Sequence, residues 1–257
     1  MRYLMIVCLV LMAACSSTLT TDNKTAYPYQ ISDEAADKSK LRRLVIATVN
    51  YGPNSPSYLR EAEPKVDAAV VAYLEKHGYE IVRGNQFDSS WSRNLDIHGA
   101  YFNPSQGIFR RKRFNAILVA TLAELRENHD IDAIVFTDLL ANKVNFDYRA
   151  PHYATWHGVK RKPRLKGGQG VPLDFNWGKT FRAASLSVVI YRADTQLMFN
   201  SAGGIEMIDN VSVKGATPTA QRKKKFFDHK GSLQEGIQLA FHPLIPMQDY
   251  PGQALRD

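Results

Sequence analysis

The chain has 257 residues, of which 44% are hydrophobic and 23% are charged, a composition typical of a globular protein rather than of a disordered one. Its length suits one sizeable domain or two small ones. The formal net charge of +8 favours partners that are anionic.

The first fifteen residues have the three parts of a secretion signal. Arg2 gives a positive start, residues 3–12 form an apolar core, and two alanines stand directly before Cys15. The apolar run is well short of the roughly 20 residues that a membrane-spanning helix needs. We therefore expect a signal that is removed, either that of a lipoprotein or an ordinary secretory signal peptide that happens to contain a cysteine.

This segment resembles the signal peptide of bacterial lipoproteins, whose lipobox places small residues before an acylated cysteine. The resemblance implies that residues 1–14 are removed and that Cys15 carries a diacylglyceride thioether and an N-acyl chain such as palmitate. Ser16, in place of Asp, implies the outer membrane, with the protein on its periplasmic face. Several acyl chains hold a protein to a membrane far more firmly than one does.

The inferred compartment bears on two questions, namely whether the protein contains a disulfide and which anions it can meet. Cys8 lies in the segment that is removed and Cys15 is blocked by lipid, so the mature protein has no disulfide and its fold depends on a hydrophobic core. A basic surface often indicates nucleic acid, but the cell envelope contains none. The anions within reach are phospholipid head groups, lipopolysaccharide phosphates and cell-wall carboxylates.

The mature chain is expected to have three parts. Residues 15–40 are polar, show no sustained period and are predicted to form a flexible tether. Residues 41–245 are predicted to form a single periplasmic α/β domain, and residues 246–257 an irregular tail.

The domain begins with an alternation of strands and helices. Residues 44–49 are apolar and β-branched, which is typical of a strand buried on both faces. Helical spacing of apolar residues from Pro64 onward, with Gly78 just past the last of them, predicts a helix that ends there. Residues 79–82 follow as a second strand. Residues 85–106 are rich in Asn, Ser, Asp and Gly, and we expect them to form an irregular excursion.

The clearest amphipathic stripe covers residues 114–125 and predicts a second main helix. Four cations precede it at residues 110–113, where they oppose the helix dipole, and either a binding role or a solvated surface accounts for them. Residues 131–139 are expected to form a central strand. The alternation over residues 144–148 predicts a half-exposed neighbouring strand.

Two later strands, at residues 185–191 and 197–199, complete the pattern. We predict an α/β fold with a mixed sheet of about five to six strands, flanked by two main amphipathic helices. Over residues 44–207 this succession resembles the N-terminal domain of the TolB translocation protein, the curli-secretion lipoproteins and the lipoprotein activators of penicillin-binding proteins. These relatives variously scaffold, form channels or activate enzymes, so the resemblance implies a fold and no single function.

The most distinctive segment is a basic aromatic loop at residues 151–179. Cations interleaved with aromatic residues and glycines suit a surface that grips polyanions or stacks on sugar rings. The alternative is a solvated basic hairpin whose tryptophans pack on the core as lids. The candidate anion-binding residues are Lys160, Arg161, Lys162, Arg164 and Lys166, and the candidate aromatic contacts are Trp156 and Trp177.

The C-terminal part adds a second cationic run and a helix. The run covers residues 222–225. Beyond it, Ser232 and Glu235 form a capping box, which predicts a short helix through Leu239.

No residues form a recognisable catalytic or metal-binding constellation. His152 and His157 are not spaced to share a helical face, and no cysteine or carboxylate completes a zinc site beside them. Asp132 and Asp138 lie on one side of a predicted strand but about 20 Å apart, too far to share a proton transfer. Serine-hydrolase, metalloprotease and phosphate-loop motifs do not occur. We therefore expect a protein that is not an enzyme and that uses no cofactor or metal.

These features together predict an outer-membrane lipoprotein whose periplasmic domain is a non-catalytic binding or assembly module of the cell envelope. Its expected partner is an envelope protein, recognised by the basic aromatic loop or by an exposed sheet edge. One alternative is an oligomeric channel or secretion lipoprotein, in which residues 143–148 and 185–206 of several copies extend into a membrane barrel. The other is a binder of anionic cell-wall or lipopolysaccharide groups through residues 160–166.

Overall fold

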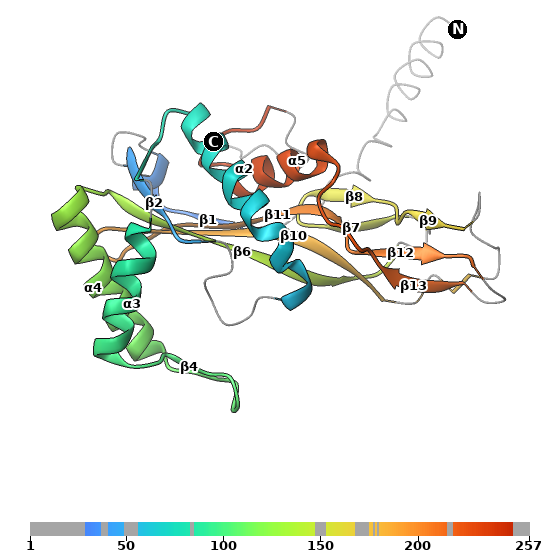
Figure 1. Cartoon of the computed structure of the whole chain (residues 1–257). Helices are drawn as coiled ribbons and strands as arrows, with labels where there is room; N and C mark the ends of the chain where they lie inside the picture. Colours follow the sequence, from blue (N-terminus) through green and yellow to red (C-terminus); the bar gives the residue numbers. More distant parts are fainter. Residues whose placement is uncertain are drawn as a thin grey trace, which may run out of the picture.

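A six-stranded mixed β-sheet forms the centre of the protein in the computed structural model (Figure 1). Residues 1–28, which include the predicted signal, Cys15 and much of the predicted tether, lie outside the described residues, as does Trp177. The structure describes residues 29–36, 41–48, 56–82, 85–146, 153–167, 175–176, 178, 180–214 and 218–248.

The sheet has the strand order β1, β11, β10, β6, β2, β3. β2 pairs in parallel with both β3 and β6, whereas the pairings among β6, β10, β11 and β1 are antiparallel. This mixed sheet confirms the predicted α/β fold. Residues 185–206, which the channel alternative extends into a membrane, belong to β10, to β11 and to the turn between them, near the middle of the sheet. The strands span Gln30–Ile31 (β1), Arg43–Ile46 (β2), Glu80–Val82 (β3), Ala133–Val144 (β6), Phe181–Arg192 (β10) and Leu197–Met207 (β11).

Helices cover both faces of the sheet (Figure 1). α2 and α5 lie on one face, where Val70 and Ile237 join the main core. α3 and α4 lie on the other face, where Trp91 and Leu122 belong to a second core. In the described ranges no helix is both long and apolar enough to cross a bilayer. The α-helices span Glu63–Lys76 (α2), Gln86–His98 (α3), Arg111–His129 (α4) and Lys230–Phe241 (α5), with short 3-10 helices at Asp33–Ala36 (η2) and Ser57–Ala62 (η4).

The two predicted main helices form where the sequence places them. α2 carries Pro64 in its first turn, where a missing N–H costs no hydrogen bond. It ends just before Gly78, whose φ of +88° is a conformation that glycine adopts without strain. α4 covers the predicted stripe and ends at His129, and its C-cap Asp130 takes a left-handed conformation. The predicted short C-terminal helix is α5, but it begins at Lys230 and its N-cap is His229, whose Nδ1 accepts the N–H of Ser232. Ser232 therefore lies inside the helix and is not the cap that the capping box predicts.

Residues 85–106 contradict the predicted irregular excursion. They form α3 and the short strand β4 (Phe102–Asn103), which pairs in a hairpin with β5 (Ile108–Phe109) just beyond this range. Within the described residues, four α-helices flank the sheet: the two predicted main helices, the predicted short C-terminal helix, and α3, which the sequence pattern does not predict.

Polar residues explain why the pattern of α3 was missed. Its buried face consists of Phe87, Ser90, Trp91 and Asn94, which recur at helical spacing, but two of the four are polar. Ser90 Oγ and Asn94 Nδ2 donate to Glu124 Oε2 of α4, at 2.8 and 3.2 Å. A hydrogen-bonded contact between α3 and α4 thus replaces part of the apolar stripe that hydrophobicity alone can detect.

The three longest strands, β6, β10 and β11, extend well past β2 and β3, and we call this extension the distal end (Figure 1, right). On one face it is covered by a hairpin of β7 (Ala154–Trp156) and β8 (Val159–Arg161). At its tip, β9 (Leu165–Lys166), β12 (Asp209–Ser212) and β13 (Thr219–Arg222) form a small sheet. Of the strand expected over residues 144–148, Val144 is the last residue of β6 and Phe146 forms a single bridge to Ala154, while residues 147–148 lie outside the described residues.

Two adjacent glycines of β11 let other elements approach the sheet closely. A Cβ on Gly203 would lie 2.0 Å from the carbonyl oxygen of Gly236 in α5. A Cβ on Gly204 would lie 2.3 Å from Cγ2 of Val159 in β8. Both α5 and the β7–β8 hairpin therefore depend on a missing side chain in β11.

Candidate anion-binding surface at the distal end

Backbone pairing at the distal end brings two cationic segments together. β9 pairs in parallel with β12, and the N–H groups of Val211 and Val213 donate to the carbonyl oxygens of Arg164 and Lys166. β12 pairs on its other side with β13, which leads into the second cationic run at residues 222–225. The clusters at 160–166 and 222–225, which are far apart in the sequence, thus occupy one end of the molecule.

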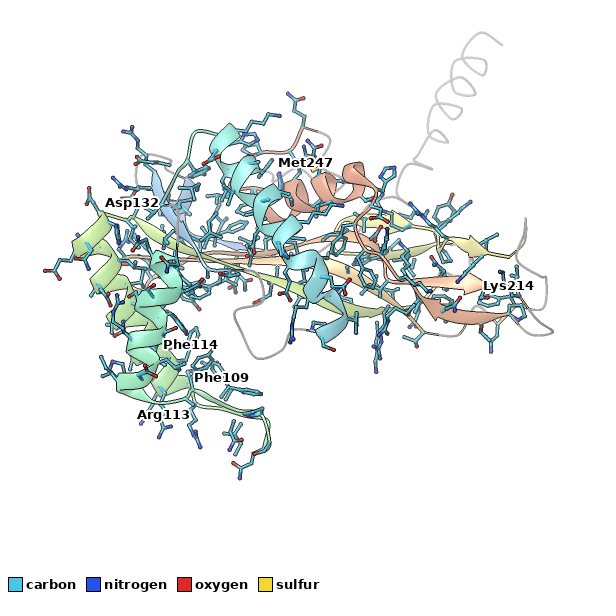
Figure 2. All side chains as sticks on the ribbon, in the orientation of Figure 1. Phe109, Arg113, Phe114, Asp132, Lys214 and Met247 are labelled. Carbon is cyan, nitrogen blue, oxygen red and sulfur yellow. The ribbon has the colours of Figure 1, made fainter. Side chains whose placement is uncertain are left out.

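Exposed cations of this small sheet and its flanking segments form what we call the distal basic surface. The Lys166 ammonium donates to Gln221 Oε1 at 3.1 Å, and the Lys214 stem packs against Gly167. Figure 2 labels Lys214 at the tip of the distal end. The members of the distal basic surface are Lys162, Arg164, Lys166, Lys214, Lys224 and Lys225.

Two lysines cover the half-buried ring of Tyr153 in the loop. The ammonium groups of Lys160 and Lys162 lie 5.1 and 4.5 Å from the ring centre of Tyr153. Such cation–π contacts hold the lysine stems in place and leave their charges near the surface. Tyr153 is a part of this arrangement that the sequence analysis did not single out.

Arg161 has a different role from its neighbours. Its Nη2 lies 2.5 Å from Glu235 Oε2 in α5, and its Nε donates to the carbonyl oxygen of Ile205. The guanidinium therefore ties β8 to α5 and to β11, and it is not a member of the distal basic surface.

Trp156 also points inward. Its side chain belongs to the distal core, the residue is only 7% exposed, and its Nε1–H donates to the carbonyl oxygen of Ala184 at 3.1 Å. This is the lid position that the sequence analysis gave as an alternative to a ligand contact. The other candidate, Trp177, lies outside the described residues.

Two acidic residues at the distal end form hydrogen bonds and ion pairs with other groups of the protein. Glu206 accepts the backbone N–H of Phe227 at 2.9 Å and lies 3.3 Å from the ammonium of Lys223, with both charged side chains about nine-tenths buried. Burial lowers the pKa of Lys223, although the Glu206 charge opposes this effect. Asp209 accepts the N–H of Arg182 and lies 3.7 Å from Nε of Arg222. Neither carboxylate is therefore displayed beside the exposed cations.

A serine–histidine contact at the β7–β8 turn has the wrong surroundings for catalysis. Nδ1 of His157 lies 2.7 Å from Oγ of Ser185, and Nδ2 of Asn142 donates to the same hydroxyl at 2.8 Å. Ser185 is fully buried, so a substrate has no access to it. Burial lowers the pKa of His157, which keeps the imidazole neutral near pH 7. The contact fastens the β7–β8 turn to β10.

The two aspartates weighed in the sequence analysis have separate surroundings. Asp132 Oδ2 accepts the backbone N–H groups of Arg42 and Arg43 at 2.8 and 2.7 Å, just before β6 begins. Asp138 lies within β6, and burial raises its pKa. Over the described part of the chain, no three His, Cys, Asp or Glu side chains form a group that could hold a metal ion.

A groove between α2 and α5 has a different character from the distal end. It consists of two adjoining hollows of about 360 and 390 Å³ that share Tyr73 and Lys76. Burial, and secondly the charge of Tyr79, raises the pKa of Tyr73 to about 12. The hollow of about 360 Å³ is lined mainly by apolar groups. Lys65, which also lines it, donates to the carbonyl oxygen of Phe227 at 2.6 Å.

Comparisons with known proteins identify no family. No protein-family model and no curated protein match the chain. Among solved structures it is similar to the lipoprotein GNA1162 from Neisseria meningitidis, with 11% sequence identity and a TM-score of 0.32, over 65% of this chain and 83% of that one.

Proposed function

We propose that this protein is a lipid-anchored lipoprotein of the cell envelope and that its α/β domain is a non-catalytic binding module. The anchor is the lipid on Cys15, and the proposed location is the periplasmic face of the outer membrane. The ligands of the module are anionic envelope polymers that display phosphates or carboxylates, such as lipopolysaccharide and peptidoglycan. The distal basic surface is the part of the module that binds them.

The concentration of exposed cations at one end of the sheet carries this proposal. Lys162, Arg164 and Lys166 lie beside Lys214 and the second cationic run, whereas Glu206 and Asp209 are turned to internal partners. The potential of the summed positive charges attracts a polyanion over about one Debye length, roughly 10 Å at 0.1 M salt. Such a surface needs no deep pocket, because a polymer contacts several side chains at once.

The proposal is tested by co-sedimentation with purified peptidoglycan sacculi and with lipopolysaccharide, over a range of salt concentrations. The protein lacks residues 1–14 and carries Cys15→Ser, so that no acyl chain contributes to sedimentation. A variant combining Lys162→Gln, Arg164→Gln, Lys166→Gln and Lys214→Gln should bind about tenfold more weakly at low salt and should show a flatter dependence on salt.

A variant of equal net charge provides the control. It combines Arg42→Gln, Arg60→Gln, Lys76→Gln and Arg126→Gln, which remove four exposed cations outside the distal end. Its binding should stay close to that of the unsubstituted protein. An equal loss in both variants, or binding that does not respond to salt, contradicts the proposal.

A further inference from the structure

A second exposed surface lies away from the distal end, below the sheet in Figure 1. The β4–β5 hairpin extends away from the ends of α3 and α4 and has no layer of the fold beyond it in Figure 1. Ile108 and Phe109 on this hairpin are 47% and 49% exposed, and Ile97 in the last turn of α3 is 74% exposed. Isolated exposed apolar residues are common, but here two stand next to each other in sequence on a hairpin that projects from the fold.

The hairpin is held firmly at its base. The ring of Phe109 lies 5.8 Å from that of Tyr101 and 5.5 Å from that of Phe114, and both of these rings contact Trp91 in the core. The N–H of Arg110 donates to the carbonyl oxygen of Tyr101. Phe109 is therefore held by a packed aromatic cluster while about half of the residue stays exposed.

Four cations follow the exposed apolar residues directly. Nη1 atoms of Arg110 and Arg113 donate to the carbonyl oxygen of Ala100, which fixes them beside the hairpin. Arg111 and Lys112 are exposed in the first turn of α4, where the helix dipole disfavours positive charge. Figure 2 labels Phe109, Phe114 and Arg113 together at the base of the hairpin. We call the hairpin and residues 110–113 the β4–β5 finger.

We propose that the β4–β5 finger docks onto a membrane surface that contains anionic lipids. Ile108 and Phe109 enter the interfacial layer, and the cations at 110–113 contact lipid phosphates. Exposed apolar side chains bordered by arginines and lysines are the combination that peripheral membrane segments use. The density of positive charge beside the apolar residues favours an anionic lipid surface over a protein partner or a second copy of the chain.

This inference goes beyond the proposed function, because it concerns another surface. Arg113 of the finger and Lys214 of the distal basic surface lie far apart in Figure 2. In Figure 1 the finger projects below the sheet, whereas the distal end extends along the long strands to the right, so the two surfaces face different directions. The membrane contact does not depend on polymer binding, so a failure of one leaves the other standing.

A local fluorescent probe tests the contact. The mature chain with Cys15→Ser also carries Phe109→Trp, and it is mixed with vesicles of phosphatidylcholine alone or with phosphatidylglycerol, in both cases with brominated acyl chains. With phosphatidylglycerol present, we expect the tryptophan emission of the Phe109→Trp variant to shift to the blue. The brominated chains should quench this emission at least about twofold more than they quench the emission of the protein with Phe109 intact. Arg111→Gln together with Lys112→Gln should abolish most of this change.

Leu197→Trp is the matched control, because Leu197 is 38% exposed at the start of β11, away from the finger. Its emission should not respond to the vesicles. An unchanged Phe109→Trp signal, an equal signal with pure phosphatidylcholine, or an equal signal from Leu197→Trp overturns the inference. Emission that shifts with protein concentration but not with vesicles also overturns it and assigns the finger to contacts between copies.

Discussion

The distal basic surface and the β4–β5 finger both combine cations with aromatic rings, yet they present different chemistry. At the distal end the rings are covered, since Trp156 is buried and Tyr153 lies beneath Lys160 and Lys162. In the finger, Phe109 keeps about half of its surface open beside the cations. Similar stretches of sequence thus produce one surface that is almost purely charged and another that is both charged and apolar.

The difference arises from what lies behind each hairpin. The β7–β8 hairpin packs flat on the sheet because Gly204 leaves space for Val159 and Trp156. The β4–β5 hairpin contacts the rest of the protein only at its base in the described residues, through the cluster of Phe109 with Tyr101 and Phe114. A hairpin that packs against a sheet buries its aromatic residues, whereas a hairpin that extends from the fold leaves them partly exposed.

The largest effect is expected from Gly204→Val, which removes the space beneath the β7–β8 hairpin. The new side chain would collide with Val159 and with the backbone of Trp156, so the free energy of unfolding should fall by about 3 kcal/mol. Gly107→Ala in the finger is the control. Gly107 has a φ of +64° but open space around it, so only about 1 kcal/mol of backbone strain is expected. Chemical denaturation that gives equal losses for the two would contradict this account of the distal end.

A smaller loss is expected from Glu206→Gln, which leaves the buried Lys223 ammonium without its counter-charge. The free energy of unfolding should fall by about 2 kcal/mol, because the amide oxygen can still accept the Phe227 N–H. Glu235→Gln breaks the more exposed pair with Arg161 and should cost less than about 1 kcal/mol. A smaller loss in the free energy of unfolding for Glu206→Gln than for Glu235→Gln would contradict the role of Glu206 as the buried counter-charge of Lys223.

Acidification should destabilise the β7–β8 hairpin, which carries His157, at a higher pH than it destabilises the β4–β5 finger. The folded-state pKa of His157 lies below its unfolded value of about 6.5 because burial disfavours the charged ring. The unfolded chain therefore binds more protons as the pH falls below about 6.5, so stability that is fully present above this pH is lost below it. His242, whose pKa burial also lowers, acts in the same direction.

Hydrogen exchange followed by mass spectrometry checks this prediction. Between about pH 7 and pH 5, protection of residues 153–161 should fall more than that of residues 101–110, after correction for intrinsic exchange rates. His157→Asn, which suits the positive φ of this position, should reduce the pH dependence of the distal peptides. Equal behaviour of the two hairpins would contradict the assigned role of His157.

The smallest effect is expected from Ile108→Ser in the finger. Ile108 is about half exposed, so its replacement should change the free energy of unfolding by no more than about 0.5 kcal/mol. Thermal and chemical denaturation measure this directly. A loss of several kcal/mol would show that the apolar residues of the finger serve the fold rather than an external contact.

Elements with a complete apolar period could be predicted from the sequence. The runs that became β2, α2, α4 and β6 each carry an unbroken pattern that matches their burial. α3 was missed because Ser90 and Asn94 occupy half of its buried face. β9, β12 and β13 are too short to show a period, and the pairing of β9 with β12 joins segments distant in the sequence.

The candidate site could be predicted in its composition but not in its arrangement. The cations at 160–166 are evident as a run, whereas their meeting with Lys214 depends on tertiary pairing. The turning of Arg161 toward Glu235 likewise depends on where α5 packs. The exposed apolar residues of the finger could not be recognised, because exposure is a property of the folded chain and α3 had not been predicted.

The mass of the native protein, purified from cell membranes, tests the central claim most directly. We predict a chain that begins at residue 15 and is heavier than its sequence by a diacylglyceryl group and one further acyl chain, all carried by Cys15. A mass that corresponds to an uncleaved chain, or to a mature chain with no acyl groups, would contradict the envelope anchor on which the proposed function depends.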